Sequence, residues 1–353
     1  MKFGFLFLPS FDAATHTNAA TLYQHIFQQV ELGDSLGFDC VWCAEHHFCA
    51  YGGDIPNPPT FLAALAQHTK NMRLGTAGVA LPLNRPLNTA EQLAMVDNMC
   101  GGRLDIGVVR AFMESEYRVL QVDMDESRER FNEGVDIIRG TWANESFSYH
   151  GKHNHFDDVE LRPRPIQSKP RLVVGSVRTV ESIQYAGRMG LDLMVIPYAV
   201  SLDKIKETIG IYREALDAGG HRQEDHTVMG SLHMFVGQNE KRTCDLVRDP
   251  IVRYVGYLRD AVKADKWSKD YQGYTGMSKM IEALMDFDIM YDMRSAFGDP
   301  AHASECIAAY EEAGIGEMPF ITIMPGLAQE HILESIQCFA EDVMPRFKTP
   351  SQG

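Results

Sequence analysis

Residues 74–109 of this 353-residue chain read LGTAGVALPLNRPLNTAEQLAMVDNMCGGRLDIGVV. The apolar run Leu74–Leu81 predicts a strand, Leu87–Cys100 predicts a helix, and the β-branched run Leu104–Val109 predicts a second strand. Two strands joined by a crossover helix lie parallel in one sheet, because the crossover returns the chain to the same end of the sheet. This stretch therefore predicts a parallel sheet with helices packed against it.

The same alternation of a short apolar run and a longer helical pattern repeats along the chain. The other predicted strands are Phe3–Leu8, Phe38–Ala44, Arg171–Gly175, Leu193–Ile196, Val228–Val236 and Met318–Ile323. The other predicted helices are Ala19–Leu36, Thr60–Thr69, Ser127–Thr141, Thr179–Met189, Leu202–Asp217 and Gln329–Met344. Eight strand–helix units in this order predict an α/β fold, a (β/α)8 TIM barrel.

The chain is longer than a bare barrel, which needs about 250 residues. The surplus predicts insertions before strands five and eight. The polar stretch Ser148–Lys169 is typical of a hairpin, and Tyr254–Phe297 is expected to be helical or to form a lid over the barrel. We expect residues 1–347 to form a single barrel domain and residues 348–353 to form a short C-terminal tail.

Composition narrows the range of partners. Lysine and arginine number 33 against 48 aspartates and glutamates, so the formal net charge is −15. Such a charge repels nucleic acid and anionic membranes as main partners. No apolar run reaches the roughly 18 residues that span a bilayer. Seven cysteines, an odd number mostly in apolar settings, are typical of reduced thiols, so we expect a cytoplasmic protein.

Nucleotide-binding motifs are absent from the sequence. There is neither the glycine-rich dinucleotide fingerprint nor a P-loop. A redox enzyme with this sequence therefore has no obvious site for a nicotinamide of its own.

Catalytic candidates follow the second predicted strand, in the sequence Glu45-His46-His47-Phe48. Histidine is the natural proton donor and acceptor near neutral pH. Neighbouring residues of an extended chain point to opposite faces, so His46 and His47 cannot easily share a metal ion and one of them is expected to face the barrel mouth. The alternative, two structural histidines bonded to loop backbone, has about equal weight.

An anion site is predicted where the fifth strand meets its helix. Thr179 and Ser182 open that helix, whose free N–H groups and dipole favour negative charge. The alternative is an ordinary helix cap. Arg110, at the end of strand four, favours the anion site because a buried arginine needs an anion. Arg128 is a further candidate, and its alternative is a solvated helix residue.

Three other motifs are interpreted as structural. Cys40-Val41-Trp42-Cys43 has the spacing of a redox motif but lies within a strand, so we expect it to pack in the core. His150, His153 and His155 lie in a polar hairpin, and we expect a surface turn and no metal site. The methionines of the second insertion are expected to fill apolar gaps; they are Met285, Met290 and Met293.

Taken together, several weak motifs give the chain a resemblance that spans nearly its whole length. It resembles the bacterial luciferase α chain and, more widely, the luciferase-like flavin monooxygenases. The matching segments are Glu45–Phe48, Gly75–Val79 with Leu81-Pro82, Gly102–Gly107 with Arg110, Asp123–Asp125 with Ser127-Arg128, Gly298–Pro300, Glu305–Ile307 and Asp342–Pro345.

The resemblance implies a barrel that binds reduced FMN at the C-terminal ends of its strands. His46 matches the family's catalytic histidine, and Glu45 would line the same pocket. Ala77 and Gly78 match a pair that is joined by a cis peptide bond against the flavin ring. The family's FMN-phosphate ligands match Arg110, Arg128, Thr179 and Ser182, and at the same mouth we assign Ser176 and Tyr198 to the cofactor site.

The activity implied is that of a two-component monooxygenase. A separate reductase would supply reduced FMN, which reacts with O2 to a C4a-peroxyflavin that oxygenates a small organic substrate. An aldehyde, a ketone or a natural-product intermediate, free or bound to a carrier, would fit. The resemblance also implies a homodimer built on the helices around Phe61–Ala66 and Leu87–Met99, with no metal.

The sequence departs from the luciferase α chain in two places. Val109 stands where that chain has a reactive cysteine, and the loop Cys49–Pro59 is more similar to monooxygenases of natural-product pathways. The first departure leaves flavin oxygenation untouched, because that thiol is not essential to the family's chemistry, whereas the loop argues against light emission and a long-chain aldehyde substrate. Two other functions stay open: a deazaflavin-dependent oxidoreductase that transfers hydride, and a non-catalytic partner subunit of a heterodimer.

Overall fold

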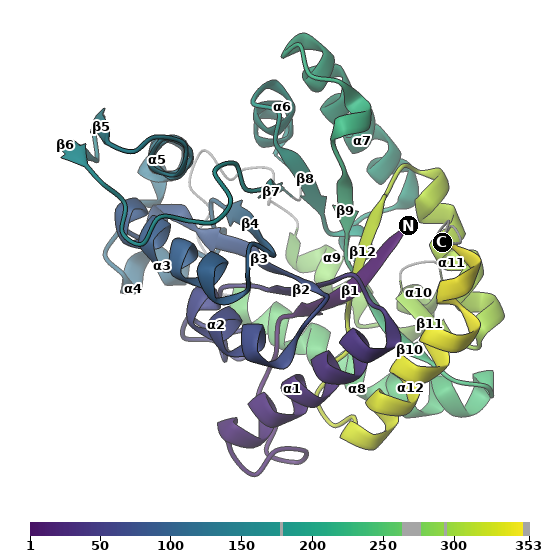
Figure 1. Ribbon diagram of the computed structural model, residues 1–353. Helices are drawn as coiled ribbons and strands as arrows, with labels where there is room; N and C mark the ends of the chain where they lie inside the picture. Colours follow the sequence, from purple (N-terminus) through teal and green to yellow (C-terminus); the bar gives the residue numbers. More distant parts are fainter. Residues whose placement is uncertain (177–178, 263–276, 293–294, 349–353) are drawn as a thin grey trace, which may run out of the picture.

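The parallel sheet of this protein closes into a barrel (Figure 1). β1 (Lys2–Phe7) pairs in parallel with β2 (Cys40–Cys43) on one side and with β12 (Glu317–Ile321) on the other. The predicted (β/α)8 barrel is therefore confirmed, and the C-terminal ends of all its strands share one rim. A computed structural model gives this structure and describes residues 1–176, 179–262, 277–292 and 295–348.

Between β2 and β12 the remaining strands follow in chain order, each parallel to its neighbours. They are β3 (Arg73–Ala80), β4 (Leu104–Val109), β7 (Leu172–Gly175), β8 (Asp192–Val195) and β9 (Val228–Gly230), which continues into β10 (Leu232–Val236).

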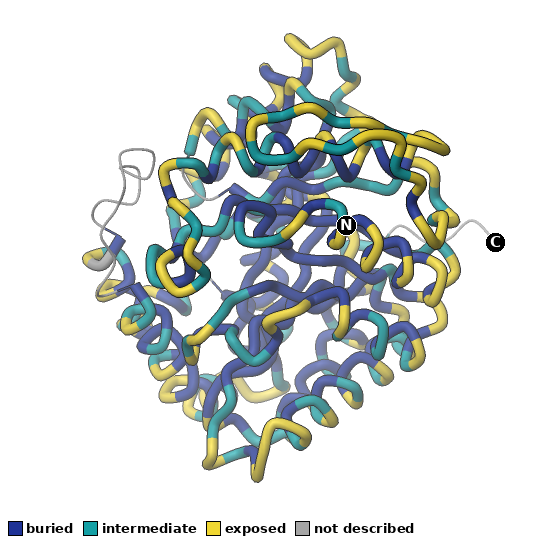
Figure 2. The backbone as a smooth tube through the Cα atoms, turned by 90° about the vertical axis from the view of Figure 1, so that its left-hand side faces the viewer, coloured by how far each residue is buried: buried dark blue, intermediate teal, exposed yellow. Residues whose placement is uncertain are grey.

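Helices surround the barrel, and the strands form its buried centre (Figure 2). The longer helices are α1 (Ala19–Leu36), α2 (Pro58–His68), α3 (Pro86–Met99), α5 (Ser127–Ala143), α6 (Val180–Arg188), α7 (Leu202–Ala218), α8 (Glu240–Val262), α11 (Pro300–Glu312) and α12 (Gln329–Asp342). Shorter ones are α4 (Glu114–Val119), α9 (Met277–Leu284) and α10 (Phe287–Tyr291). None of the helices in the described ranges has both the length and the apolar character needed to cross a membrane.

The elements match the prediction closely in most places and differ at the seventh predicted strand, Val228–Val236. The helix Ala19–Leu36 and the strand Leu104–Val109 have the predicted bounds. The prediction of one uninterrupted strand over Val228–Val236 is wrong, because the strand divides into β9 and β10. Both segments pair with β12, but on their other side β9 pairs with β8 and β10 pairs with β11 (Ser295–Gly298). β11 begins within the stretch Tyr254–Phe297, which was expected to be helical or to form a lid.

The first predicted insertion forms a hairpin, as expected. β5 (Phe147–His150) and β6 (His155–Val159) pair antiparallel and project from the barrel (Figure 1). Of the second insertion, α8 and α9 contribute described residues, whereas residues 263–276 lie outside the described ranges. The expected tail 348–353 also lies outside them, apart from Lys348.

The cysteine motif and the described methionines of the second insertion pack in or against the core, as expected. Cys40 and Cys43 are both buried, and burial raises the pKa of each thiol. All seven cysteines are free thiols. Met290 is buried and Met285 packs against the core, while Met293 lies outside the described residues.

A buried ionic cluster closes the floor of the barrel, at the N-terminal ends of the strands. The Arg171 guanidinium lies 2.7 Å from Glu317 Oε2, 2.6 Å from Asp192 Oδ2 and 3.5 Å from Asp105 Oδ2. Burial lowers the pKa of Arg171, but these carboxylates more than offset that effect and raise it above its ordinary value. One cation thus ties together β4, β8 and β12.

Removing this cation should destabilise the fold strongly. Arg171→Met removes the guanidinium from the three buried carboxylates that it contacts. Loss of one partner of a buried ion pair costs about 3–5 kcal/mol. Urea denaturation at pH 7 measures the free energy of unfolding. The matched control is Arg162→Met, which breaks an exposed pair with Glu160 and should cost less than about 1 kcal/mol. Equal losses in the two variants would contradict this role of Arg171.

Candidate active site

One cavity opens at the C-terminal rim of the barrel, where the sequence placed its candidates. It is lined by every candidate residue except Arg128: Glu45, His46, Ala77, Gly78, Arg110, Ser176, Thr179, Ser182 and Tyr198. Arg128 lies in the first turn of α5, and it is Phe131, one turn further on, that lines the cavity. The structure therefore brings the predicted set together and leaves Arg128 outside the lining.

His46 is held by a carboxylate from another part of the chain. Its Nδ1 lies 3.1 Å from Glu116 Oε1, and the same oxygen accepts the backbone N–H of His47 at 2.9 Å. Glu116 is 2% exposed and belongs to α4. Phe112 packs its ring edge against the imidazole, with ring centroids 5.8 Å apart. Because Nδ1 is engaged by Glu116, Nε2 is the ring nitrogen that remains for a ligand in the cavity.

Glu45 organises the end of β2. Its Oε1 accepts hydrogen bonds from Asn84 Nδ2 at 2.8 Å and pairs with His47 Nε2 at 2.9 Å, while Oε2 accepts the Ala80 N–H at 3.1 Å. The hydrogen bond to Glu45 raises the pKa of His47. His47 is not among the residues that line the cavity, as the alternation of an extended chain predicts.

The backbone at Ala77 and Gly78 corrects one expectation. The cis peptide bond of the described residues is Arg162–Pro163, so the Ala77–Gly78 bond is trans. Gly78 instead has φ = 130°, and the register between β3 and β4 shifts at this point. A side chain at Gly78 would strike Val109, since a Cβ there would lie 2.5 Å from Cγ1. A bulge built on glycine thus gives this wall its bare backbone without a cis bond.

Positive charge and hydroxyl groups converge at the ends of two neighbouring strands. Val108 of β4 lies opposite Val174 of β7, so Arg110 and Ser176 follow adjacent strands at the same level. Thr179 is the N-cap residue of α6, and its side chain makes no capping bond there. With Ser182 it lines the cavity beside the positive end of the helix dipole. Arg110 is 8% exposed, and this combination favours an anionic group.

The second insertion and two tyrosines form another part of the wall. Tyr51 and Tyr198 are buried, with their hydroxyl oxygens 3.1 Å apart. Burial raises the pKa of Tyr198 to about 12 and raises that of Tyr51 too, so both hydroxyls stay neutral. Apolar side chains from α8 and α9 line the same cavity, namely Leu258, Met277 and Met280.

Comparison with known proteins places this arrangement in a family. The sequence profile described as luciferase-like monooxygenase matches residues 1–317. The chain belongs to the luciferase-like monooxygenase family. The resemblance found in the sequence is thereby confirmed, and membership of this family makes the chain an oxidoreductase.

Individual members of the family are similar along almost their whole length. The alkanal monooxygenase alpha chain of a Kryptophanaron alfredi symbiont is 24% identical over 330 residues, which cover 91% of this chain and 92% of that protein. The oxygenase component of the flavin-dependent trigonelline monooxygenase of Acinetobacter baylyi is 26% identical over 331 residues, covering 92% and 90%. The crystal structure of monooxygenase RslO1 from Streptomyces bottropensis superposes with a TM-score of 0.87, at 29% identity, and covers 99% of this chain and 100% of that one.

The sequence of this luciferase-like monooxygenase did not identify Glu116 as the partner of His46. The residue lies 70 positions from His46, in a short charged segment with nothing to distinguish it from Glu114. Only the approach of α4 to the end of β2 brings the two side chains together. The one available signal was that the carboxyl group of Glu116 follows Arg110 by six residues.

Sequence reasoning also missed His233, which lies on β10 behind the cavity wall. Its ring is fully buried and packs edge-on against Tyr198 and Tyr254, at centroid distances of 4.7 and 5.0 Å. Among the described residues, neither ring nitrogen has a hydrogen-bond partner. Burial lowers the pKa of His233 to about 3, so the folded luciferase-like monooxygenase holds this imidazole neutral.

This buried imidazole should make the fold sensitive to acid. The unfolded chain protonates His233 below about pH 6.5 whereas the folded chain does not, so stability falls as the pH drops. His233→Phe removes the effect, because phenylalanine takes up no proton. Lowering the pH from 8 to 5 should therefore raise the free energy of unfolding of the variant, relative to that of the wild type, by about 2 kcal/mol. Urea denaturation at the two pH values tests this, and an equal difference at both would contradict it.

Proposed function

We propose that this chain is the oxygenase component of a two-component monooxygenase, supplied with reduced FMN by a separate flavin reductase. One observation carries the proposal: the anion-binding end formed by Arg110, Thr179 and Ser182 opens into the same cavity as the His46–Glu116 pair. A phosphate-bearing cofactor and a positioned imidazole can therefore be held side by side.

The residues of the cavity fit FMN. Arg110, Ser176, Thr179 and Ser182 would hold its phosphate through a guanidinium and hydroxyl groups. The bare backbone at Gly78 lines the cavity and offers a surface on which a planar ring can lie closely. When bound, reduced FMN would supply the electrons with which O2 is activated for transfer of one oxygen atom to substrate.

The protein's own contribution is to place a proton and to exclude water. Glu116 orients His46 through Nδ1, so the imidazole can hold or move a proton at Nε2 inside the cavity. Leu258, Met277 and Met280 make the remaining wall apolar, which favours a neutral organic substrate and keeps solvent from the reacting groups. An aldehyde, a ketone or a natural-product intermediate, free or carrier-bound, meets these requirements.

The need for a reductase follows from what the chain lacks and from the kind of protein it is similar to. The sequence has no dinucleotide fingerprint, and a relative is named as the oxygenase component of a flavin-dependent monooxygenase. We also propose a homodimer built on α2 and α3, because Met95 and Met99 lie one turn apart on α3 and are 46% and 47% exposed.

Arg110→Met tests the phosphate site. Wild type should bind reduced FMN more tightly than reduced riboflavin, which lacks the phosphate, by at least about tenfold, since hydrogen bonds to charged groups contribute about 1.5–3 kcal/mol. The variant should lose that difference, whereas Arg118→Met, a change at an exposed arginine of α4, should keep it. Anaerobic fluorescence titration measures the affinities.

Two outcomes of this titration would contradict the proposal. One is equal affinity of the wild type for FMN and riboflavin. The other is tighter binding of the deazaflavin F420, which would favour a hydride-transfer oxidoreductase. Arg110→Lys keeps a positive charge and should show intermediate selectivity, which separates a charge effect from misfolding.

Glu116→Gln tests the role of the imidazole. The amide keeps the shape and an acceptor for the His47 N–H but loses the charge of the carboxylate that orients the His46 imidazole through Nδ1. When protein with reduced FMN is mixed with O2, His46 is no longer held in place to keep the reduced oxygen for transfer to substrate. Oxidised FMN and H2O2 should therefore appear faster, by about 10²-fold, the low end of the effect of a positioned acid–base group. Stopped-flow absorbance measures the rate. Glu114→Gln in the same helix is the control, and identical rates in both variants would contradict the role.

A further inference from the structure

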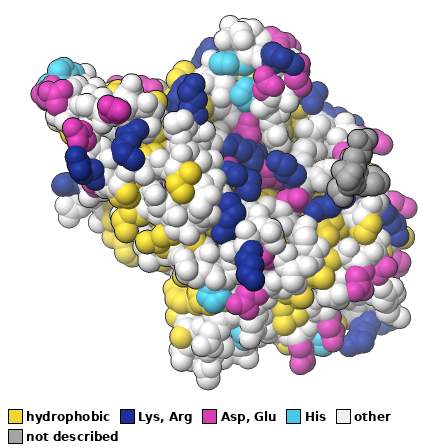
Figure 3. Space-filling model, in the orientation of Figure 1, with side chains coloured by type: hydrophobic (Ala, Val, Ile, Leu, Met, Phe, Trp, Pro, Cys, Tyr) yellow, Lys and Arg dark blue, Asp and Glu magenta, His cyan; other side chains and the backbone are white. Residues whose placement is uncertain are grey.

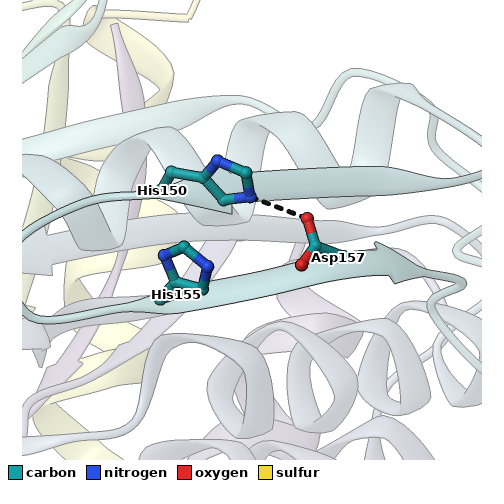
Figure 4. Close-up of side chains that lie close together, drawn as sticks. All are labelled: His150, His155 and Asp157. Carbon is teal, nitrogen blue, oxygen red and sulfur yellow. Dashed lines mark hydrogen bonds and ion pairs between the residues drawn. The ribbon is translucent and has the colours of Figure 1, made fainter.

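The outward face of the β5–β6 hairpin carries a group of side chains that the flavin chemistry does not use. His150, His155 and Asp157 lie together on this face, and all three are exposed (Figure 4). None of them lines the cavity at the barrel rim. Figure 3 shows histidine and acidic side chains side by side at the corner where Figure 1 places β5 and β6.

The register of the hairpin brings these residues together. His150 of β5 lies directly opposite His155 of β6. Asp157 is two residues beyond His155 on the same strand, so its side chain points to the same face. The two imidazole rings stack at a centroid distance of 4.2 Å, and His150 Nε2 lies 2.7 Å from Asp157 Oδ1. One ligand atom from each residue lies within 4.8 Å of the other two.

The loop that joins β5 and β6 is tied to α5, which holds the backbone of the hairpin in place. Glu133 of α5 accepts hydrogen bonds from the backbone N–H groups of Lys152 and His153 and from Asn154 Nδ2, at 2.6, 3.1 and 2.9 Å. On the other face of the hairpin, Tyr149 stacks with Phe156. Binding an ion here would therefore require little ordering of the backbone.

The surrounding charges leave the group accessible to a cation. The Lys152 ammonium is held by Glu129 at 2.6 Å, so it is paired away from the face. His153 turns to the same helix, with Nε2 3.3 Å from Glu129. The sequence argued against a metal because the three histidines lie in a polar hairpin. In the structure His153 lies outside the group, and Asp157 takes its place beside His150 and His155.

The donor set indicates the class of ion. Two imidazoles and one carboxylate suit zinc and neighbouring divalent transition metals, whereas magnesium and calcium prefer oxygen ligands alone. The hydrogen bond between His150 and Asp157 explains why these two side chains lie together, but it does not explain why His155 stacks on His150.

We propose that His150, His155 and Asp157 bind one divalent transition-metal ion of the zinc class on the outward face of the hairpin. Three protein ligands leave one position of a tetrahedral site for water or for a donor from another molecule. Such an ion would link the two strands of the insertion. Because the site is separate from the cavity, binding should leave FMN affinity unchanged.

Isothermal titration of the chelator-treated full chain with zinc chloride at pH 7.5 tests the proposal. We expect one zinc ion per chain. His155→Gln and Asp157→Asn should each weaken binding at least about tenfold, the smallest effect expected when a metal site loses one of its groups. Excess magnesium should not compete, and lowering the pH should weaken binding because protons compete for the imidazoles.

His68→Gln is the matched control, because His68 also forms an exposed pair with a carboxylate, Glu31 at 2.6 Å, but offers no third donor. It should bind zinc as wild type does. Melting curves of the metal-free variants establish that each is folded, and zinc should raise the melting temperature of wild type by mass action. No zinc binding by wild type, or equal binding by His155→Gln, would overturn the proposal.

Discussion

The ionic cluster around Arg171 is the constraint on which the closed barrel depends. A single guanidinium meets carboxylates from β4, β8 and β12 at the floor of the molecule. Glu317 also accepts the indole N–H of Trp42, at 3.0 Å, so β2 joins the same cluster. Three strands are thereby held at their N-terminal ends, and β2 is tied to them through the side chain of Trp42. Because the strands are parallel and the sheet closes between β1 and β12, their C-terminal ends must meet at the opposite rim.

That rim is where the chemistry gathers, and much of it could be predicted from the sequence. Each strand end is local in sequence, so Glu45 and His46 after β2, Arg110 after β4 and Ser176 after β7 could be assigned to one mouth as soon as the barrel was recognised. In a parallel barrel, residues that follow different strands all lie at the same end of the molecule. Such a residue can therefore be placed from the local sequence, without knowing which distant residues it contacts.

The features that escaped prediction all depend on contacts between distant parts of the chain. Glu116 reaches His46 across 70 residues, and the hydroxyls of Tyr51 and Tyr198 meet across 147. The predicted strand Val228–Val236 pairs with β12 along its length, but its other neighbour changes from β8, beside β9, to β11, beside β10. The local sequence pattern does not reveal this change of neighbour. The trans bond at Ala77–Gly78 shows that a backbone device expected from a family can be replaced by another, here a glycine bulge.

The central claim is that one cavity holds a flavin phosphate at Arg110 and a flavin ring beside His46. A crystal structure of the chain with FMN tests it most directly. We expect the phosphate to lie against Arg110, Thr179 and Ser182, the ring to lie against the backbone of Gly78, and His46 Nε2 to face the ring. A phosphate bound elsewhere, or a ring remote from His46, would contradict it.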